Sequence, residues 1–493
     1  MDIKRSSGLI LHPTSLPSKY GIGDFGKSTF KFLDLLHESK TSLWQVLPLG
    51  ITDEIAFSPY ASKSSILGNP YLISLDYFEN EISNKELLKT LENLPTEHVN
   101  FEKVYETKNK IFYELSNNID LNNDEIKKFL DRKLIKEHIV FKTLSDKLKI
   151  NWTEWDKEYL TYSIDLYNHV ISNFNHEFKF NVFTQYHFYL QWQKVKEYAN
   201  SKNIKILGDI PIYVNHDSAD VWLNKDLFDL DENFKMNYVS GAVPDAFTTD
   251  GQIWGTALYN WDKHLEENYK YWINKLNILL ENYDFLRIDH FVGFFQFWAI
   301  PQNESALNGH WRNGPWKSFF EIVSKKVPFE RLLAEDLGVE LDETDEILKE
   351  YNIPGMLLLE QRIPNGDDSE ETKPELWEEN YAAYTGTHDS PTIKQWLDNA
   401  NTTQLKAFNE YSENLNEKFS EDVWNFISLI WSTPSVLAIT TVQDLLQLGS
   451  EARFNVPGTE IGNWKWRLSS LNLLKDPLNK ISKLNEVYNR SNS

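Results

Sequence analysis

Four acidic residues stand at the ends of short apolar runs, and this placement is the clearest chemical signal in the chain. The four residues and the segments that precede them are Asp209 after Ile206-Leu207-Gly208, Asp289 after Phe285-Leu286-Arg287-Ile288, Glu335 after Leu332-Leu333-Ala334, and Asp389 after Thr385-Gly386-Thr387-His388. If the runs are parallel strands, their carboxyl ends share one mouth and the four carboxylates converge there. Like charges gathered in this way need a proton or a cation for compensation. Arg287, His290 and His388 are the adjacent basic candidates.

Glycosidic bond cleavage fits such a cluster, because it needs one carboxylate at the anomeric carbon and one carboxylic acid at the leaving oxygen. Metal-dependent hydrolysis competes with it, since Asp, Glu and His also bind divalent cations. A single strand-terminal aspartate is more often a helix cap or a turn residue, but four on separate strands favour a shared site. The chain has no cysteine and no His-x-His or His-Glu-x-x-His pattern. We therefore expect neither a zinc site nor a cofactor.

Eight short apolar runs with strand character recur along the chain, each closed by a polar or glycine-containing turn. They cover residues 8–11, 43–49, 204–212, 285–289, 331–336, 355–360, 383–388 and 436–442. Segments of helical periodicity, such as 269–282 and 340–351, separate most of them. This alternation predicts an α/β protein with a (β/α)8 TIM barrel, for which a doubly wound open sheet is the alternative. We expect no separate C-terminal β-sandwich domain.

The uneven spacing of the runs predicts one catalytic barrel over 1–493 that carries large insertions after its strands. Residues 51–203 are rich in Lys, Glu, Leu and Asn and predict one or more mainly helical subdomains. Residues 213–262 are dense in Asp, Gly, Trp and Phe, and this composition predicts a lid or substrate groove. Residues 301–330 are predicted to form a smaller insertion. Such insertions overhang the C-terminal face of a barrel, where barrel enzymes keep their active sites.

Charge and composition narrow the range of partners. The 73 acidic and 50 basic residues give a net charge of −23, which argues against nucleic acid and anionic membranes as partners. We find no secretion signal, and polar residues interrupt the most apolar stretch, 424–442. We therefore expect no membrane segment and a cytoplasmic location, and the oligomeric state stays open. Aromatic residues make up 14 %, and Trp and Tyr rings can cover the apolar face of a sugar.

An ordered series of motifs makes the chain resemble a known family. The motifs span about residues 7–468 and are Gly8-Leu9-Ile10-Leu11-His12-Pro13, Ser58-Pro59-Tyr60, Gly68-Asn69-Pro70-Tyr71, Gly208-Asp209-Ile210-Pro211, Gly251-Gln252-Ile253-Trp254-Gly255, Arg287-Ile288-Asp289-His290-Phe291, Ala334-Glu335-Asp336-Leu337-Gly338, Gly386-Thr387-His388-Asp389 and Gly462-Asn463-Trp464-Lys465-Trp466-Arg467. In this set and order the chain is similar to glycoside hydrolase family 77, the 4-α-glucanotransferases also called amylomaltases or disproportionating enzymes.

The resemblance implies a retaining double displacement without cofactor, through a covalent glycosyl-enzyme intermediate. A segment of an α-1,4-glucan or maltooligosaccharide passes to the 4-hydroxyl of an acceptor, which is glucose, maltose or a longer oligosaccharide. The resemblance makes Asp289 the nucleophile, Glu335 the general acid/base and Asp389 the stabiliser of the transition state. It implies these substrate-binding residues: Tyr60, Ser58, Asp209, Gln252, Trp254, Arg287, His388, Asn463 and Trp464.

Strand geometry agrees with these roles. Arg287 lies two residues before Asp289 and so points to the same side of the strand, where a cation favours an ionised carboxylate. Glu335 follows apolar residues, which favour its protonated form. An α-amylase-type hydrolase, which makes reducing ends without redistributing chains, is the alternative function. A catalytically silent glucan-binding protein is a third hypothesis, and the presence of both acids speaks against it.

Three departures from the family pattern leave the carboxylates intact. Ser390-Pro391-Thr392 follows Asp389 where the family has Asn-Asp-Thr. Val292 stands where an Arg is common, and Val243 replaces a usual proline in the stretch 241–247. We expect these changes to affect acceptor preference and the lid.

Overall fold

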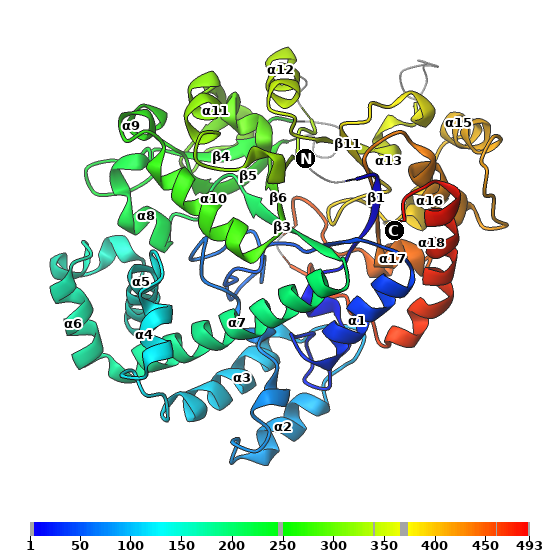
Figure 1. The fold of residues 1–493 in the computed structure, drawn as a ribbon. Helices are drawn as coiled ribbons and strands as arrows, with labels where there is room; N and C mark the ends of the chain where they lie inside the picture. The colour runs from blue at the N-terminus through cyan, green and yellow to red at the C-terminus, as the bar shows by residue number, and fades with distance from the viewer. Residues whose placement is uncertain (1–3, 245–249, 339–340, 365–372, 460, 492–493) are drawn as a thin grey trace.

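A parallel eight-stranded sheet forms the centre of the molecule (Figure 1). The computed structural model describes residues 4–244, 250–338, 341–364, 373–459 and 461–491. The strands, in sheet order, are β10 (Gly355–Leu358), β11 (Tyr381–Tyr384), β12 (Leu437–Thr441), β1 (Ser6–Ile10), β2 (Leu43–Gln45), β3 (Lys205–Pro211), β6 (Phe285–Asp289) and β9 (Leu332–Ala334). Each of the eight predicted runs overlaps one of them.

The two end strands of this sheet also meet. The backbone N–H of Ala334, in β9, donates to the carbonyl oxygen of Pro354, just before β10, at 2.9 Å. The N–H of Met356 donates to the carboxylate of Asp336 at 2.7 Å. The sheet is therefore a nearly closed barrel, and the predicted (β/α)8 class is confirmed, whereas the open doubly wound sheet is not.

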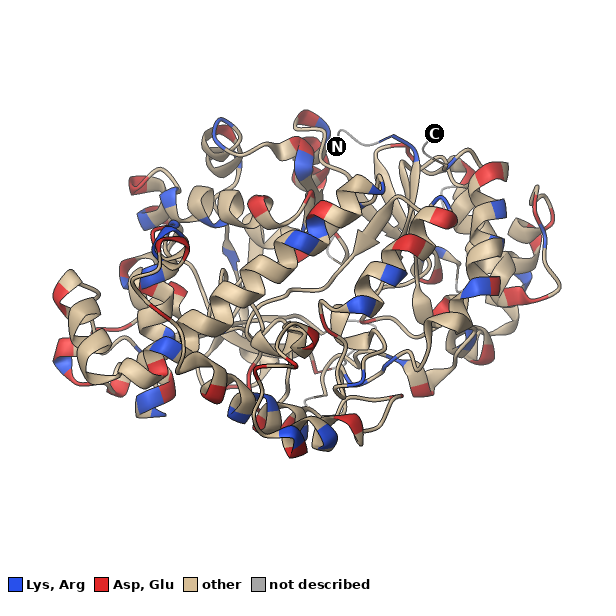
Figure 2. Cartoon of the chain, turned by 60° about the horizontal axis from the view of Figure 1, so that its bottom comes forward, with Lys and Arg blue, Asp and Glu red and all other residues tan. Residues whose placement is uncertain are grey.

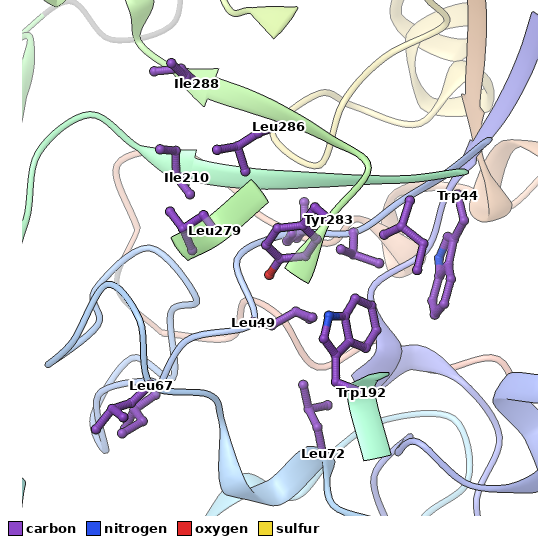
Figure 3. Packing of buried hydrophobic residues seen from close by; sticks show 14 of the residues in the cluster. Trp44, Leu49, Leu67, Leu72, Trp192, Ile210, Leu279, Tyr283, Leu286 and Ile288 are labelled. Atoms are coloured by element: carbon purple, nitrogen blue, oxygen red, sulfur yellow. The ribbon is translucent and has the colours of Figure 1, made fainter. Parts of the chain in front are cut away.

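Alternation along the strands produces an inner and an outer apolar layer. The inner layer includes Leu207, Phe285 and Leu333, which lie on the side of their strands that faces the barrel axis. On the outer face, Ile210, Leu286 and Ile288 pack against helices, as Figure 3 shows. Gly208 also faces outward, and a Cβ there would lie 2.5 Å from the ring of Tyr283. A glycine at 208 is therefore needed for this ring to pack on β3.

Helices surround the barrel (Figure 1). Those that follow or precede its strands are α1 (Lys27–Glu38), α7 (Asn175–Ser201), α10 (Lys270–Asn282), α11 (Lys317–Val323), α12 (Asp342–Glu350), α14 (Ile393–Asn399), α15 (Thr402–Ser412), α16 (Asp422–Ser432) and α18 (Lys475–Val487). Predicted helical segments 269–282 and 340–351 contain α10 and α12. Figure 2 shows acidic and basic residues spread over the helices.

The stretch 51–203 is mainly helical. It contains α2 (Lys85–Glu92), α3 (Phe101–Ser116), α4 (Asp124–Leu130), α5 (Ile135–Leu148), α6 (Ile164–Asn173) and α7, of which α2 to α6 lie to one side of the barrel in Figure 1. Side chains cap the first turns of four of these helices by accepting hydrogen bonds from backbone N–H groups, at Asn84, Asn100, Asn123 and Ser163. These caps satisfy donors that a helix start leaves without a partner.

A small antiparallel sheet lies beside the barrel and was not predicted. Its strands, in sheet order, are β5 (Gln252–Ala257), β4 (Tyr238–Ala242), β7 (Gln296–Pro301) and β8 (His310–Asn313). It joins residues of the stretches 213–262 and 301–330 in one sheet. The strands are short, β4 and β5 each contain a glycine, and three middle residues of β5 are exposed, so the sequence lacks the apolar alternation that would have indicated them.

A buried arginine helps to fix the last described turn of the chain to the barrel. Arg490 donates to the carbonyl oxygens of Trp431 at 2.8 Å, Thr433 at 2.9 Å and Ser6 at 3.1 Å. It therefore connects the start of β1 to the end of α16 and to the residues after α18.

We expect Arg490→Met to lower the free energy of unfolding by about 3 kcal/mol, because several buried carbonyl oxygens lose their donor. Urea unfolding followed by tryptophan fluorescence measures the change. Lys483→Met is the control: it removes only the exposed ion pair with Glu417, which is worth about 0.5 kcal/mol. Equal losses in the two variants would contradict the structural role of Arg490.

Candidate active site

The carboxyl ends of three neighbouring strands bring acidic residues together. Asp209 lies in β3, Asp289 ends β6, and Glu335 directly follows β9, and these strands are adjacent in the barrel. Asp209 and Asp289 share the strand face of the inner apolar layer, and Glu335 follows Leu333 of that layer by two residues. The barrel thus has an apolar layer below and a charged layer above, at its C-terminal face.

Asp389 lies in a loop, which corrects the predicted strand 383–388. Strand β11 ends at Tyr384. The N–H of Thr387 donates to the hydroxyl of Ser390 at 3.0 Å, and the N–H of Ser390 to the carbonyl of Thr387 at 3.3 Å. This turn uses the backbone groups that a further strand would need, so the chain leaves the sheet before Asp389.

Arg287 occupies the centre of the charged layer. Its Nη1 donates to both carboxylate oxygens of Asp209, at 2.8 and 2.7 Å, and its Nη2 lies 2.8 Å from Oδ1 of Asp289. Arg287 and Asp209 are both buried. Burial raises the pKa of Asp209, and the Arg287 cation opposes that rise. One guanidinium therefore compensates two carboxylates and fixes their orientation.

Tyr60 and His388 form the next part of the site. The Tyr60 hydroxyl donates to Asp209 at 2.8 Å, and its ring stacks on the His388 ring with 5.0 Å between the centroids. His388 Nε2 lies 3.2 Å from Oδ2 of Asp389. Burial lowers the pKa of His388, but the Asp389 carboxylate outweighs burial, so the pKa is raised.

Asp389 is held by three neighbours, His388, Asn455 and Arg453. Burial works to raise its pKa, yet His388 and a hydrogen bond from Asn455 lower it to about 2. Asn455 Nδ2 donates to Oδ1 of Asp389 at 2.5 Å, and Arg453 donates to the Asp389 carbonyl oxygen at 2.6 Å. Asp389 is therefore an anion at neutral pH.

The environment of Glu335 raises its pKa, whereas that of Asp389 lowers its pKa. Burial, followed by the negative charge of Asp289, raises the pKa of Glu335 to about 8, although Arg287 opposes this. The backbone N–H of His290 donates to Oε2 of Glu335 at 2.6 Å, which fixes the carboxyl group next to the residue that follows Asp289. Adjacent strands thus carry one carboxyl group that is paired with a cation and one that keeps its proton at neutral pH.

A cleft of about 620 Å³ opens above these residues. Nine of the twelve predicted site residues line it: Ser58, Tyr60, Gln252, Trp254, Asp289, His388, Asp389, Asn463 and Trp464. The other three, Asp209, Arg287 and Glu335, contact this set or its neighbours from within the barrel. The structure therefore gathers all twelve around one cleft.

Several residues next to the site were not predicted. Arg453 and Asn455 belong to none of the motifs, and their partner Asp389 is more than sixty residues away in the sequence, so no local pattern indicates them. Glu360 is buried, and burial raises its pKa to about 8 in spite of a hydrogen bond with Ser390. Because Glu360 ends the predicted run 355–360, the signal that identified the other acids was also present there.

The described residues contain neither a metal-binding cluster nor a membrane-spanning helix. Among them, no group of three or more His, Asp or Glu side chains is arranged to hold a metal ion. In the same part of the chain, no helix has the length and apolar character needed to cross a bilayer.

Comparison with known proteins identifies the family. Residues 11–473 match the model of the glycoside hydrolase 77 family, which is described as 4-alpha-glucanotransferase. The chain belongs to this family. It is 37 % identical over 495 residues to the 4-alpha-glucanotransferase of Aquifex aeolicus (strain VF5), covering 99 % of each chain. With the chloroplastic/amyloplastic 4-alpha-glucanotransferase of Solanum tuberosum it shares 36 % over 484 residues, or 95 % of this chain and 83 % of that one.

A solved structure gives the same result. The amylomaltase from Streptococcus agalactiae in complex with acarbose has a TM-score of 0.92 and 32 % identity, and the match covers 99 % of this chain and 100 % of that one. The predicted resemblance is confirmed. The chain is a 4-alpha-glucanotransferase, and the α-amylase-type alternative is not favoured.

We expect Arg287→Met to destabilise the enzyme by about 3–5 kcal/mol near pH 8, because Asp209 then lacks its buried cation. Loss of the cation raises the pKa of Asp209 further, so the folded state takes up a proton more readily than the unfolded state. Stability of the variant should therefore rise as the pH falls from 8 to 5.

Urea unfolding at the two pH values measures this effect. Arg132→Met is the matched control, because its partner Glu281 is exposed and the loss should be small and similar at both pH values. A loss for Arg287→Met that is the same at pH 5 and pH 8 would contradict the electrostatic explanation.

Proposed function

We propose that Asp289, Glu335 and Asp389 carry out the transfer of α-1,4-glucan segments by a double displacement. The observation that supports this most directly is the contrast between two neighbouring strands: Asp289 is paired with Arg287, while Glu335 has a pKa of about 8. Retaining glycosidases use one carboxylate as nucleophile and one carboxylic acid as proton donor.

In the first step, Asp289 attacks the anomeric carbon while Glu335 gives its proton to the glycosidic oxygen. The C–O bond to the leaving sugar breaks, and a covalent bond between the glucan and Asp289 forms. In the second step, Glu335 takes the proton from the 4-hydroxyl of the acceptor, whose oxygen displaces Asp289. Two inversions restore the α-configuration, and Glu335 returns to its protonated form.

Asp389 is suited to stabilise the positive charge that develops on the sugar ring between these steps. Its pKa of about 2 keeps it ionised, and it lines the cleft together with Asp289. His388 and Asn455 hold its two oxygens in place, so the anion needs little rearrangement when charge develops. His388 and Tyr60 are placed to contact the same sugar.

Transfer requires that an acceptor competes with water for the intermediate. The cleft walls contain Trp254 and Trp464, and the exposed ring of Trp254 can hold the apolar face of an acceptor sugar. We assign to the stretch 213–262 the role of a lid that limits access of water to the intermediate. Its residues 245–249 lie outside the described part of the chain. α-1,4-Glucans and maltooligosaccharides are the proposed donors, with glucose or maltose as acceptor. A cytoplasmic location stays a prediction.

Incubation with maltotriose alone should produce glucose together with oligosaccharides longer than maltotriose. The longer products arise because a second maltotriose accepts the segment held by Asp289. Chromatography of the products over time checks this result, with the Asp289→Asn variant as control. Glucose and maltose without longer products would mean hydrolysis and would refute transfer.

We expect kcat/KM to fall as the pH rises above about 8, because Glu335 then loses the proton it must donate.

Glu335→Gln should slow transfer from maltotriose about 10³-fold. With α-maltosyl fluoride, the first step of this variant should recover, since fluoride leaves without a proton. The Asp289→Asn variant should release fluoride slowly and without an initial rapid phase, because it lacks the nucleophile. Failure of the fluoride donor to restore Glu335→Gln would contradict its role as acid.

A further inference from the structure

Two tryptophans differ from the rest in exposure. All seventeen lie in the described part of the chain, and only Trp254 and Trp311 are more than a third exposed, at 37 % and 42 %. Trp254 lines the cleft. Trp311 lies in β8, the edge strand of the small antiparallel sheet, and has no part in the site described above.

A row of paired residues runs from Trp311 toward the cleft. Ile253 pairs with Gly241, Gly241 with Trp298, and Trp298 with Trp311, each across two neighbouring strands. Residues directly opposite each other in an antiparallel sheet project from the same face. Ile253, at one end of the row, lines the cleft and is 55 % exposed. Trp311, at the other end, therefore projects from the same face of the sheet as a residue of the cleft wall.

Trp298 provides a fixed support for Trp311. Its Nε1 donates to the carbonyl oxygen of Ala306 at 2.8 Å, and Ala306 also lines the cleft. A Cβ at Gly309 would lie 2.2 Å from this Nε1, so only glycine allows the loop to pass so close to the ring. The rings of Trp298 and Trp311 meet edge to face, with 5.2 Å between their centroids. The exposed ring of Trp311 is thus held in place before any ligand arrives.

The surroundings of this ring suit a neutral polar ligand. The nearest cation in the strand, Arg312, is paired with Asp229 at 2.5 Å. Asn313, which projects from the same face of β8 as Trp311, is an exposed polar side chain. A flat aromatic face among neutral hydrogen-bonding groups matches a sugar ring, which has an apolar C–H face and polar hydroxyls at its edge.

We propose that Trp311 is a remote glucan-binding subsite, on which a sugar unit stacks when an α-glucan extends from the cleft across Ile253 and Trp298. The proposal rests on the function proposed above. Three inter-strand steps of about 4.8 Å place Trp311 about 14 Å from Ile253. A chain must therefore leave the cleft by several sugar units before it reaches the ring, and short donors gain nothing from it.

The test compares short and long glucans in an Asp289→Asn background, in which turnover does not disturb binding. Calorimetry with maltotriose and with a short amylose should show that Trp311→Ala weakens binding of the amylose about tenfold. Binding of maltotriose should change less than about twofold. Trp311→Phe should keep most of the affinity for amylose, because the aromatic face remains.

Leu473→Ala is the matched control for loss of an exposed apolar side chain, since Leu473 lies in a turn that packs against α1 and α18 on the outside of the barrel. Equal losses for both glucans, or no loss for amylose, would overturn the subsite. Because this measurement uses binding alone, its outcome is separate from the maltotriose digest: a failed digest refutes the transfer function, whereas an unchanged amylose affinity refutes only the role of Trp311. Thermal unfolding of each variant confirms that the fold is intact.

Discussion

The guanidinium of Arg287, buried between Asp209 and Asp289, is the interaction on which the rest of the site depends. Three carboxylates, Asp209, Asp289 and Asp389, gather here, and among the described residues two basic side chains, Arg287 and His388, form ion pairs with them. A fourth negative charge would be costly in a buried place, and this explains why Glu335 keeps a proton at neutral pH. The acid and the nucleophile therefore differ because burial and the neighbouring Asp289 charge keep Glu335 protonated, whereas Asp289 is paired with Arg287.

This arrangement is a consequence of strand register. In the pairing of β3 with β6, Asp209 is opposite Arg287, and Leu207 is opposite Phe285. One register thus places an apolar pair in the inner layer and an ion pair directly above it. A shift by one residue would turn both the apolar and the charged side chains toward the surrounding helices. The packing that selects the correct register for stability consequently also assembles the charged site.

The sequence predicts those parts of the molecule that follow from local patterns. Strand-terminal acids such as Asp209, Asp289 and Glu335 need only the apolar run before them to be recognised, and the eight strands of the barrel were found in the same way. Asp389 was expected at a strand end but lies in a loop, because the turn at Ser390 is formed by side-chain contacts that no apolar pattern indicates. Asn455 was missed for a related reason, since its contact with Asp389 joins distant parts of the chain. The small sheet was missed because its strands are short and because β4 and β5 contain glycine, with exposed residues in the middle of β5.

The position of β1 in the barrel has a consequence for synthesis of the chain. Its neighbours are β2, which follows within forty residues, and β12, which begins at Leu437. At a translation rate of about 5–20 residues per second, β12 leaves the ribosome roughly 20–85 s after β1. During this interval one side of β1 has unpaired backbone groups, which can pair with other nascent chains. The order of strands in the barrel thus makes the growing polypeptide depend on protection of that edge until its final strand has been made.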